Sequence, residues 1–307
     1  MPKVLVTGIT GFLGSHVAEY LSEQDDVQIS GLRRKNSNLW RCNHFLDQIN
    51  WIMIDEDDQW KSIVVDLAPE VIVHCAWDGV EAKDRGNWDV QKKNLDFLLN
   101  VLDSCKEIRL KKFIFFGSQA EYGIFSGKIK EDFPSNPNNA YSNAKNACLA
   151  LLKNYADNYK FDWIWLRIFS VFGEREGDNW LIPSLVNRMK TEIEMDFTPG
   201  KQQYAYLYAR DFSKIVYRMI EKDIEMGVYN VSSNNIISIK DLVIKIRDQV
   251  NPNFRLNFGN IPYRIGQSMH VEGNIEKLQN QIGEFDFSDF NLMLENTINS
   301  YLKNNSK

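Results

Sequence analysis

Three glycines at a spacing of three residues follow the first apolar run of the chain and limit what it can fold into. The stretch "VTGITGFLGS" (6–15) places them between a predicted strand and a predicted helix. Such a turn permits a tight bend at the first glycine, close approach of a pyrophosphate at the second, and close helix-on-strand packing at the third. The anion then lies at a helix N-terminus, where unpaired N–H groups favour negative charge. We therefore predict a dinucleotide site that includes Thr7, Gly8, Gly11, Phe12, Leu13 and Gly14.

The first half of the chain alternates short β-branched runs with longer amphipathic stretches, which is typical of βαβ units. We expect strands at 3–8, 27–32, 50–54, 70–76, 112–117 and 162–169, and helices beginning near Gly14, Ser37, Gln59, Asp84 and Asn139. The predicted fold class is therefore α/β, with a doubly wound parallel sheet. Because the alternation loosens after about Gly173, we expect a nucleotide-binding domain at 1–172 and mainly a smaller substrate-binding lobe at 173–307, with part of 205–250 returning to the first domain.

The composition argues against several other classes of protein. The 307 residues carry a formal net charge of −5 and no long run of Lys or Arg, so a nucleic-acid partner is not expected. No apolar run approaches the roughly 18 residues of a membrane helix, and the first residues do not resemble a signal peptide. The four cysteines and four histidines show no metal-binding spacing, and we expect no metal. These features fit a protein of the cytoplasm without a membrane partner.

The end of the second predicted strand, "ISGLRRK", bears on the choice of cofactor. Sites that prefer NAD usually present an acidic residue there to the ribose hydroxyls, whereas arginine favours the 2′-phosphate of NADP. Gly31 occupies the expected place of the acid, and Arg33 and Arg34 follow it. We therefore favour NADP(H), with NAD(H) as the alternative if the two arginines only form a solvated loop.

A second motif carries acid–base chemistry. Tyr141 is the one tyrosine followed four residues later by lysine, Lys145, so the two side chains share a helix face. Bringing a phenol from its usual pKa near 10 to near 7 requires about 4 kcal/mol, more than an exposed ion pair supplies. The pair must therefore be desolvated and be aided by the positive charge of the cofactor. Ser118, at the end of the fifth predicted strand, is placed to donate a hydrogen bond to an oxygen beside Tyr141.

Together these motifs resemble the extended short-chain dehydrogenase/reductase family, the NAD-dependent epimerase/dehydratase group that acts on nucleotide sugars. The resemblance rests on the glycine motif, "GSQAEYG" (117–123), "YSNAK" (141–145), "LRIFSVFG" (166–173) and "GVYNVSS" (227–233), and it covers nearly the whole chain. It implies a Rossmann-type fold with Tyr141 as the acid/base, Lys145 orienting the nicotinamide ribose and Ser118 polarising the substrate oxygen. Asp55, Ala76 and Asn94 are further candidates for cofactor contacts, although Asn94 can equally be a helix-packing amide.

The resemblance also narrows the reaction. Dehydratases of this family carry an acid/base pair where this chain has Gln119 and Ala120, and alanine cannot transfer a proton. The remaining chemistry needs only a hydride and one proton, and the pattern looks most like reductases of nucleotide-linked 4-keto-6-deoxyhexoses, of the CDP-abequose or dTDP-6-deoxytalose type. An NAD-dependent 4-epimerase or sugar dehydrogenase is the alternative. A dinucleotide-binding sensor without catalysis is a second alternative.

The contacts to a nucleotide-diphosphate sugar are less clearly predicted. Candidates are Gln119, Glu121, Ser170, Tyr204 and Arg264. Arg264 matches a family position that binds the diphosphate, but Tyr204 stands where relatives often carry a second arginine, and the aromatic residues around it can also be simple packing. The family resemblance implies a homodimer formed through two helices and a setting in the assembly of surface polysaccharide.

Overall fold

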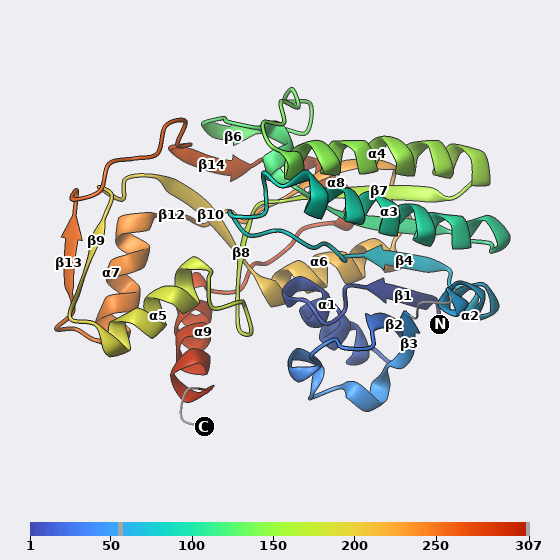
Figure 1. Ribbon diagram of the computed structural model, residues 1–307, viewed down its shortest axis with the longest axis horizontal. Helices are drawn as coiled ribbons and strands as arrows, with labels where there is room; N and C mark the ends of the chain where they lie inside the picture. Colours follow the sequence, from blue (N-terminus) through green and yellow to red (C-terminus); the bar gives the residue numbers. More distant parts are fainter. Residues whose placement is uncertain (55–57, 305–307) are drawn as a thin grey trace.

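A seven-stranded parallel sheet organises the larger lobe of the molecule (Figure 1). The computed structural model describes residues 1–54 and 58–304. The strand order is β11-β7-β5-β4-β1-β2-β3, and all neighbours are parallel. The strands are β1 (Lys3–Thr7), β2 (Gln28–Arg34), β3 (Asn50–Ile54), β4 (Val71–His74), β5 (Lys112–Ser118), β7 (Asp162–Ile168) and β11 (Gly227–Val231). The predicted doubly wound parallel sheet is confirmed.

Helices cover both faces of this sheet, as a parallel sheet with continuous apolar strands requires. One face packs against α1 (Phe12–Ser22), α6 (Ala209–Glu221) and α8 (Glu276–Ile282). The other packs against α2 (Gln59–Leu67), α3 (Trp88–Ser104) and α4 (Ala140–Tyr159). Each face buries its own cluster of aliphatic and aromatic side chains.

The strand order reverses at β1, which lies between β2 and β4. In open α/β sheets, ligands bind outside the carboxyl ends of the strands at such a reversal. The glycine turn after β1, the segment after β4 and Ser118 at the end of β5 all leave the sheet at this edge.

The smaller lobe, which carries the C-terminus, lies beside this edge (Figure 1). Its helices α5 (Leu181–Thr191), α7 (Ile239–Val250) and α9 (Phe290–Asn304) enclose a third apolar cluster. Its strands are β6 (Gly127–Ile129), β8 (Ser170–Phe172), β9 (Glu194–Phe197), β10 (Gln203–Tyr208), β12 (Ile236–Ser238), β13 (Arg255–Phe258) and β14 (His270–Gly273). Within 205–250, α6 packs on α1 and β11 pairs with β7, so this part of the stretch lies in the larger lobe, whereas β12 and α7 lie in the smaller one.

The six predicted strands of the first half are all present, whereas one predicted helix is not. Instead of a helix near Ser37 the chain forms two 3₁₀ turns, Trp40–Cys42 and Leu46–Gln48. Cys42 and Phe45 pack into the cluster beneath the glycine turn, so tertiary burial at irregular spacing replaces a helical repeat. The helix expected near Asp84 begins at Trp88, after the N-cap Asn87. In the part of the chain that the structure describes, no helix is long and apolar enough to cross a membrane.

A buried lysine fixes the strand that carries Ser118. Lys112, the first residue of β5, is only 7% exposed and donates from Nζ to the carbonyl oxygens of Met219 and Lys222, both at 2.6 Å. These carbonyls lie at the C-terminal end of α6, where a helix has no acceptor partners of its own and favours positive charge. The interaction ties the helix on one face to the strand in the middle of the sheet.

Replacing Lys112 with methionine is expected to lower the free energy of unfolding by about 2–3 kcal/mol, because the helix-end carbonyls stay buried without donors. The matched control is Lys111→Met, since Lys111 is largely exposed and pairs with Glu70 at the surface. That variant is expected to cost less than about 1 kcal/mol. Chemical denaturation measures both values, and equal losses would contradict the assigned role.

Candidate active site

The glycine turn leaves no room for side chains. Gly8 has a φ of +67°, and a Cβ atom there would lie 2.5 Å from the backbone nitrogen of Ala76. A Cβ atom at Gly14, inside α1, would lie 2.3 Å from the carbonyl oxygen of Gly8. Gly11 is the N-cap of α1 and provides no side-chain cap. The first amides of α1 are therefore open to an anion, and this backbone cradle fits the pyrophosphate of a dinucleotide.

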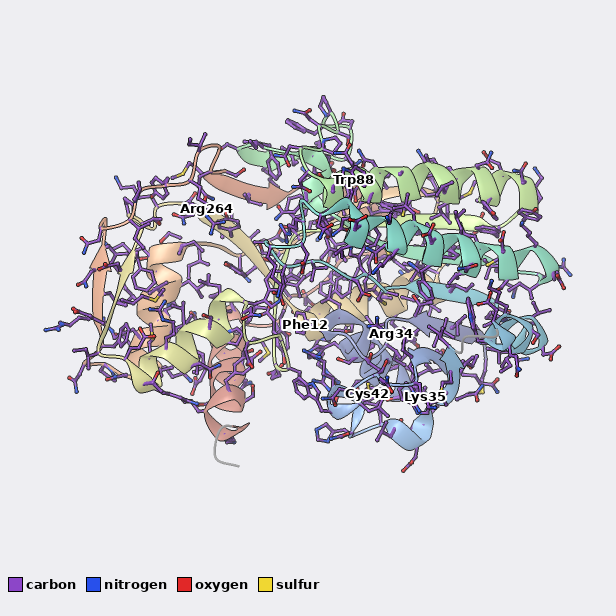
Figure 2. All side chains as sticks on the ribbon, in the orientation of Figure 1. Phe12, Arg34, Lys35, Cys42, Trp88 and Arg264 are labelled. Carbon is purple, nitrogen blue, oxygen red and sulfur yellow. The ribbon has the colours of Figure 1, made fainter. Side chains whose placement is uncertain are left out.

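The residues next to the glycine turn differ in how deeply they are buried. Phe12 and Leu13 are half-buried, and Figure 2 shows Phe12 at the junction of the two lobes. Thr7, predicted as a cofactor contact, is instead fully buried. Its hydroxyl accepts from the Ala76 N–H at 3.3 Å and lies 3.0 Å from Nδ1 of His74, so it joins β1 to β4 beneath the turn. Burial lowers the pKa of His74 to about 3, so this histidine is neutral.

Near the end of β2, a side chain at position 31 would meet neighbouring side chains. A Cβ atom on Gly31 would come within 2.7 Å of the Ile9 side chain. Arg33 follows, and its Nε is buried without a hydrogen-bond partner. Arg34 is exposed and pairs with Asp78 at 3.1 Å. The remaining predicted contact at this end, Asp55, lies outside the described residues.

Asn94 holds the segment that follows β4. The side chain is 6% exposed; its Oδ1 accepts from the Asp78 N–H at 2.8 Å, and its Nδ2 donates to the Asp78 carbonyl at 3.0 Å. Both ends of the amide are thus engaged by backbone, which is the structural role that the sequence left open beside a cofactor contact; the cofactor contact stays a prediction. Ala76, half-buried and next to Gly8, remains at the floor of the turn.

The structure brings Ser118, Tyr141 and Lys145 together. Asn139 caps α4, and Tyr141 and Lys145 lie in the first turns of that helix, against the end of β5. The Ser118 hydroxyl accepts from the Ala120 N–H at 3.2 Å and lies near enough to the Tyr141 phenol to lower its pKa. Lys145 donates from Nζ to the Phe116 carbonyl at 2.7 Å and lies 5.8 Å from the centroid of the Tyr141 ring. The phenol, hydroxyl and ammonium therefore converge at the carboxyl edge of the sheet.

Burial dominates the electrostatics of this cluster. It raises the pKa of Tyr141, while the Ser118 side chain and the charge of Arg85 act in the opposite direction. Burial lowers the pKa of Lys145 to about 7. A buried phenol ionises less readily, and a lysine with a lowered pKa is a less reliable positive charge beside it. Ionisation of Tyr141 therefore requires further positive charge, which an oxidised nicotinamide would contribute when bound.

Glu121 does not face a substrate, contrary to the sequence prediction. The residue is fully buried in a 3₁₀ turn, Gln119–Tyr122, directly after β5. Its carboxylate accepts from the Ser118 N–H at 2.7 Å, from Trp165 Nε1 at 3.0 Å and from Arg167 Nε at 2.9 Å. Glu121 therefore positions the backbone of Ser118. The sequence signal for its partner is an arginine that follows the apolar run "WIWL" (163–166) of β7, since a buried guanidinium requires a carboxylate.

The other predicted substrate contacts lie on the side of the smaller lobe. Gln119, next to Ser118, has a buried Oε1 with no partner, as expected of a group that awaits a ligand. Ser170 is half-buried on β8. Tyr204 accepts a hydrogen bond from Gln267 at 3.0 Å, and the charge of Arg264 acts on its phenol. Figure 2 shows Arg264 exposed on the smaller lobe.

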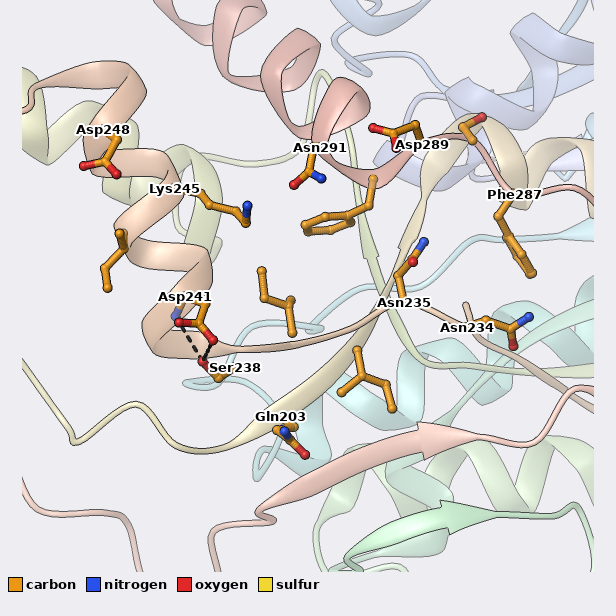
Figure 3. A pocket seen from close by; sticks show the side chains of 15 residues that line it. Gln203, Asn234, Asn235, Ser238, Asp241, Lys245, Asp248, Phe287, Asp289 and Asn291 are labelled. Carbon is orange, nitrogen blue, oxygen red and sulfur yellow. Dashed lines mark hydrogen bonds between the residues drawn. The ribbon is translucent and has the colours of Figure 1, made fainter.

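Two cavities lie away from these residues. One, of about 940 Å³, is formed by α7, β12 and the start of α9, with Asp241, Lys245 and Asp289 around it (Figure 3). The other, of about 520 Å³, lies between α1 and α9. No predicted site residue lines either cavity. Over the described ranges 1–54 and 58–304 we find no cluster of His, Cys, Asp and Glu that could hold a metal ion.

Comparison with known proteins agrees with this geometry. Residues 4–232 match the model of the NAD dependent epimerase/dehydratase family. The chain belongs to this family. It is thus an enzyme of the NAD-dependent oxidoreductase type, within the short-chain dehydrogenase/reductases, and the resemblance stated from the sequence is confirmed. The Rossmann-type fold is confirmed as well.

The following relatives share about a quarter of their residues with this chain. The chain is 25% identical to dTDP-D-glucose 4,6-dehydratase of Dictyostelium discoideum over 80% of its own length, a match that spans 61% of that protein. It is 23% identical to CDP-abequose synthase of Salmonella muenchen, with 89% of each chain covered. Among solved structures, UDP-N-acetylglucosamine 4-epimerase of Methanobrevibacter ruminantium superposes with a TM-score of 0.86 at 25% identity, covering 99% of both chains.

We predict that Glu121→Gln lowers the free energy of unfolding by about 3 kcal/mol, because it leaves the buried guanidinium of Arg167 without its counter-charge. The control is Glu107→Gln, since Glu107 is exposed on the 3₁₀ turn after α3. Thermal or urea denaturation measures the difference. A loss as small as that of the control would contradict the buried ion pair.

Proposed function

We propose that the enzyme reduces the 4-keto group of a nucleotide-diphosphate-linked 6-deoxyhexose with NADPH. The observation that carries this proposal is the convergence of Ser118, Tyr141 and Lys145 at the sheet edge that also holds the uncapped glycine turn. This arrangement provides one proton donor, one hydrogen-bond donor and one cation beside the expected place of a nicotinamide ring.

Each residue has a defined task in this reaction. NADPH held at the glycine turn would supply a hydride to C4 of the sugar. Tyr141 gives its phenolic proton to the ketone oxygen, and the Ser118 hydroxyl donates a hydrogen bond that stabilises the negative charge developing there. Lys145 orients the ribose next to the nicotinamide and favours loss of the proton from Tyr141. The burial of Tyr141 excludes water, so that the proton passes to the substrate rather than to solvent.

The turn after β5 supports reduction over dehydration. Elimination of water from a sugar requires a second acid/base pair, and Gln119 and Ala120 cannot supply one. Glu121 is the acidic residue of this turn, but its carboxylate already accepts hydrogen bonds from Ser118, Trp165 and Arg167. The residues at this position therefore suit a reaction that needs only a hydride and the proton of Tyr141.

The end of β2 supports NADPH. Position 31, the expected place of an acid for the ribose hydroxyls, is occupied by glycine, and a Cβ atom there would lie 2.7 Å from the end of the Ile9 side chain. Arg33 offers a buried and unpaired Nε. Arg34 is paired with Asp78, but an exposed ion pair contributes at most about 1 kcal/mol, which a doubly charged phosphate readily displaces.

We assign the diphosphate end of the substrate to Arg264 together with Tyr204, the phenol of which lies within the field of that guanidinium. The single arginine predicts weaker diphosphate binding than a paired-arginine site provides. We further propose a homodimer formed through α3 and α4, on which Leu95, Leu99, Ala147 and Leu151 are only half-buried.

A 4-epimerase is the second candidate, supported by the likeness to UDP-N-acetylglucosamine 4-epimerase. Epimerisation uses the same tyrosine, serine and lysine, but it regenerates its cofactor and requires no external reductant. Two assays separate these candidates. CDP-, dTDP-, GDP- and UDP-linked 4-keto sugars are supplied with NADPH or NADH, and the loss of nicotinamide absorbance is recorded. The corresponding 4-hydroxy sugar nucleotides are incubated without reductant, and inversion at C4 is followed. Consumption of NADPH supports the reductase; sugar conversion without reductant, with dinucleotide retained in the purified protein, supports the epimerase.

Tyr141→Phe is expected to lower kcat by about 100- to 10,000-fold, because it removes the acid but little of the packing. Cofactor binding, measured by fluorescence titration, should persist. The control is Tyr159→Phe on the exposed end of the same helix, for which near-normal turnover is expected. Comparable activity in the two variants would reject the assigned role of Tyr141.

The double substitution Arg33→Ala and Arg34→Ala is expected to raise the KM for NADPH by about 10- to 100-fold, from the loss of charged hydrogen bonds to the 2′-phosphate. The KM for NADH should stay nearly constant. Arg109→Ala, at an exposed position before β5, is the control. An equal rise in the KM for NADPH and the KM for NADH would show that the two arginines do not bind the 2′-phosphate.

A further inference from the structure

Two side chains of the segment between β4 and α3, neither of them in the predicted site, contact the Tyr141 ring. Figure 1 shows this connection running out to the junction of the lobes before it returns to α3. The indole of Trp77 meets the ring edge-on, with centroids 5.8 Å apart. The guanidinium carbon of Arg85 lies 5.1 Å from the ring centroid. Arg85 therefore approaches the ring more closely than the Nζ of Lys145, which lies 5.8 Å away.

Hydrogen bonds fix the position of Arg85. Its Nε donates to the Val80 carbonyl at 2.8 Å, and its own carbonyl accepts from the Tyr141 N–H at 2.9 Å. The buried amide of Gln91 donates to the carbonyls of Gly79 and Asp84 at 2.9 and 3.2 Å. The segment is thus attached both to α3 and to the first turn of α4, and the guanidinium is held against the phenol.

Lys145 is a weak source of positive charge in the protein without cofactor. Its Nζ donates to the Phe116 carbonyl and lies 3.5 Å from the centroid of the Trp77 ring. Burial lowers the pKa of Lys145 to about 7, so this side chain holds its proton less firmly than an exposed lysine does. An arginine side chain, by contrast, stays charged throughout the pH range in which enzymes work.

We propose that Arg85 is a positioning residue for catalysis: its guanidinium, held over the ring of Tyr141, supplies the fixed positive charge that stabilises the ionised phenol. The negative charge of a phenolate spreads into its ring, so a cation over the ring attracts the phenolate more strongly than the neutral phenol. The Ser118 side chain also favours ionisation of this phenol, and the Glu121 carboxylate opposes it. Lys145, whose Nζ lies 5.8 Å from the ring centroid, favours ionisation when it is protonated.

This inference rests on the proposed function, because it assigns Tyr141 as the group that transfers the proton. A phenol that ionises more readily is a stronger acid toward a ketone oxygen. The same charge supports the reverse direction, in which the phenolate accepts a proton from the sugar hydroxyl. Arg85 thus performs, independently of cofactor, part of the task that the family motif leaves to the lysine.

The test measures ionisation of the phenol directly, without substrate or cofactor. A fluorinated tyrosine, which is intrinsically more acidic, is incorporated at position 141 alone, and its single ¹⁹F resonance is followed against pH. Arg85→Gln is expected to move the midpoint upward by about 1–2 pH units. Arg85→Lys should restore part of the shift, and Arg109→Gln should leave the midpoint unchanged. A thermal melt of each variant verifies that α4 is intact.

In the native enzyme, the kcat of Arg85→Gln should fall with its pH profile displaced in the same direction, while the KM for sugar stays nearly constant. An unchanged ¹⁹F midpoint overturns the proposal. So does a raised KM with an unchanged midpoint, which would make Arg85 a substrate contact. A shifted midpoint in a protein that turns over no keto sugar would retain the inference and reject the proposed function.

Discussion

The contact between Gly14 and the carbonyl of Gly8 determines how the rest of the site is placed. Without a Cβ atom at either residue, α1 begins immediately beyond β1, with its first amides facing the sheet edge. Thr7 and His74 join β1 to β4 just below, and so the floor of the turn and the segment after β4 share one rigid support. A side chain at Gly14 would push α1 away from β1 and so remove the anion-binding turn, even with every other residue of the site unchanged.

The buried ionisable side chains around this support are of two kinds: some hold the fold together, and others take part in the proposed reaction. Glu121 and Arg167 neutralise each other inside the core and hold the Ser118 backbone. Lys112 secures the opposite end of the same strand against α6. Tyr141 and Lys145, in contrast, are buried without an opposing ionic partner at bonding distance. Burial raises the pKa of Tyr141 and lowers that of Lys145, so it favours the neutral form of each side chain. The cluster is therefore poised for added positive charge, from a bound nicotinamide and, as we infer, from Arg85.

The sequence predicted the parts of this arrangement that depend on local spacing. Glycines three residues apart, a tyrosine and lysine one helical turn apart, and a serine at a strand end all occupy the expected places. Features that depend on contacts between distant segments were missed. Glu121 turns inward because Arg167 and Trp165 lie on the neighbouring strand, and the residues after Ser37 form turns because Cys42 and Phe45 pack under the glycine turn. Arg85 and Trp77 lie in a segment with no motif, so only their approach to Tyr141 reveals a role.

In the reaction that we propose, this site moves one hydride and one proton and breaks no other bond to hydrogen. The most direct measurement is isotope tracing by mass spectrometry and NMR, with NADPH deuterated at the transferable position of the nicotinamide and a nucleotide-linked 4-keto-6-deoxyhexose as substrate, and in parallel with unlabelled NADPH in D₂O. The account predicts one deuterium at C4 of the sugar from the cofactor and no carbon-bound deuterium from solvent. Solvent deuterium at C5, or a product that carries none of the cofactor label, would contradict it.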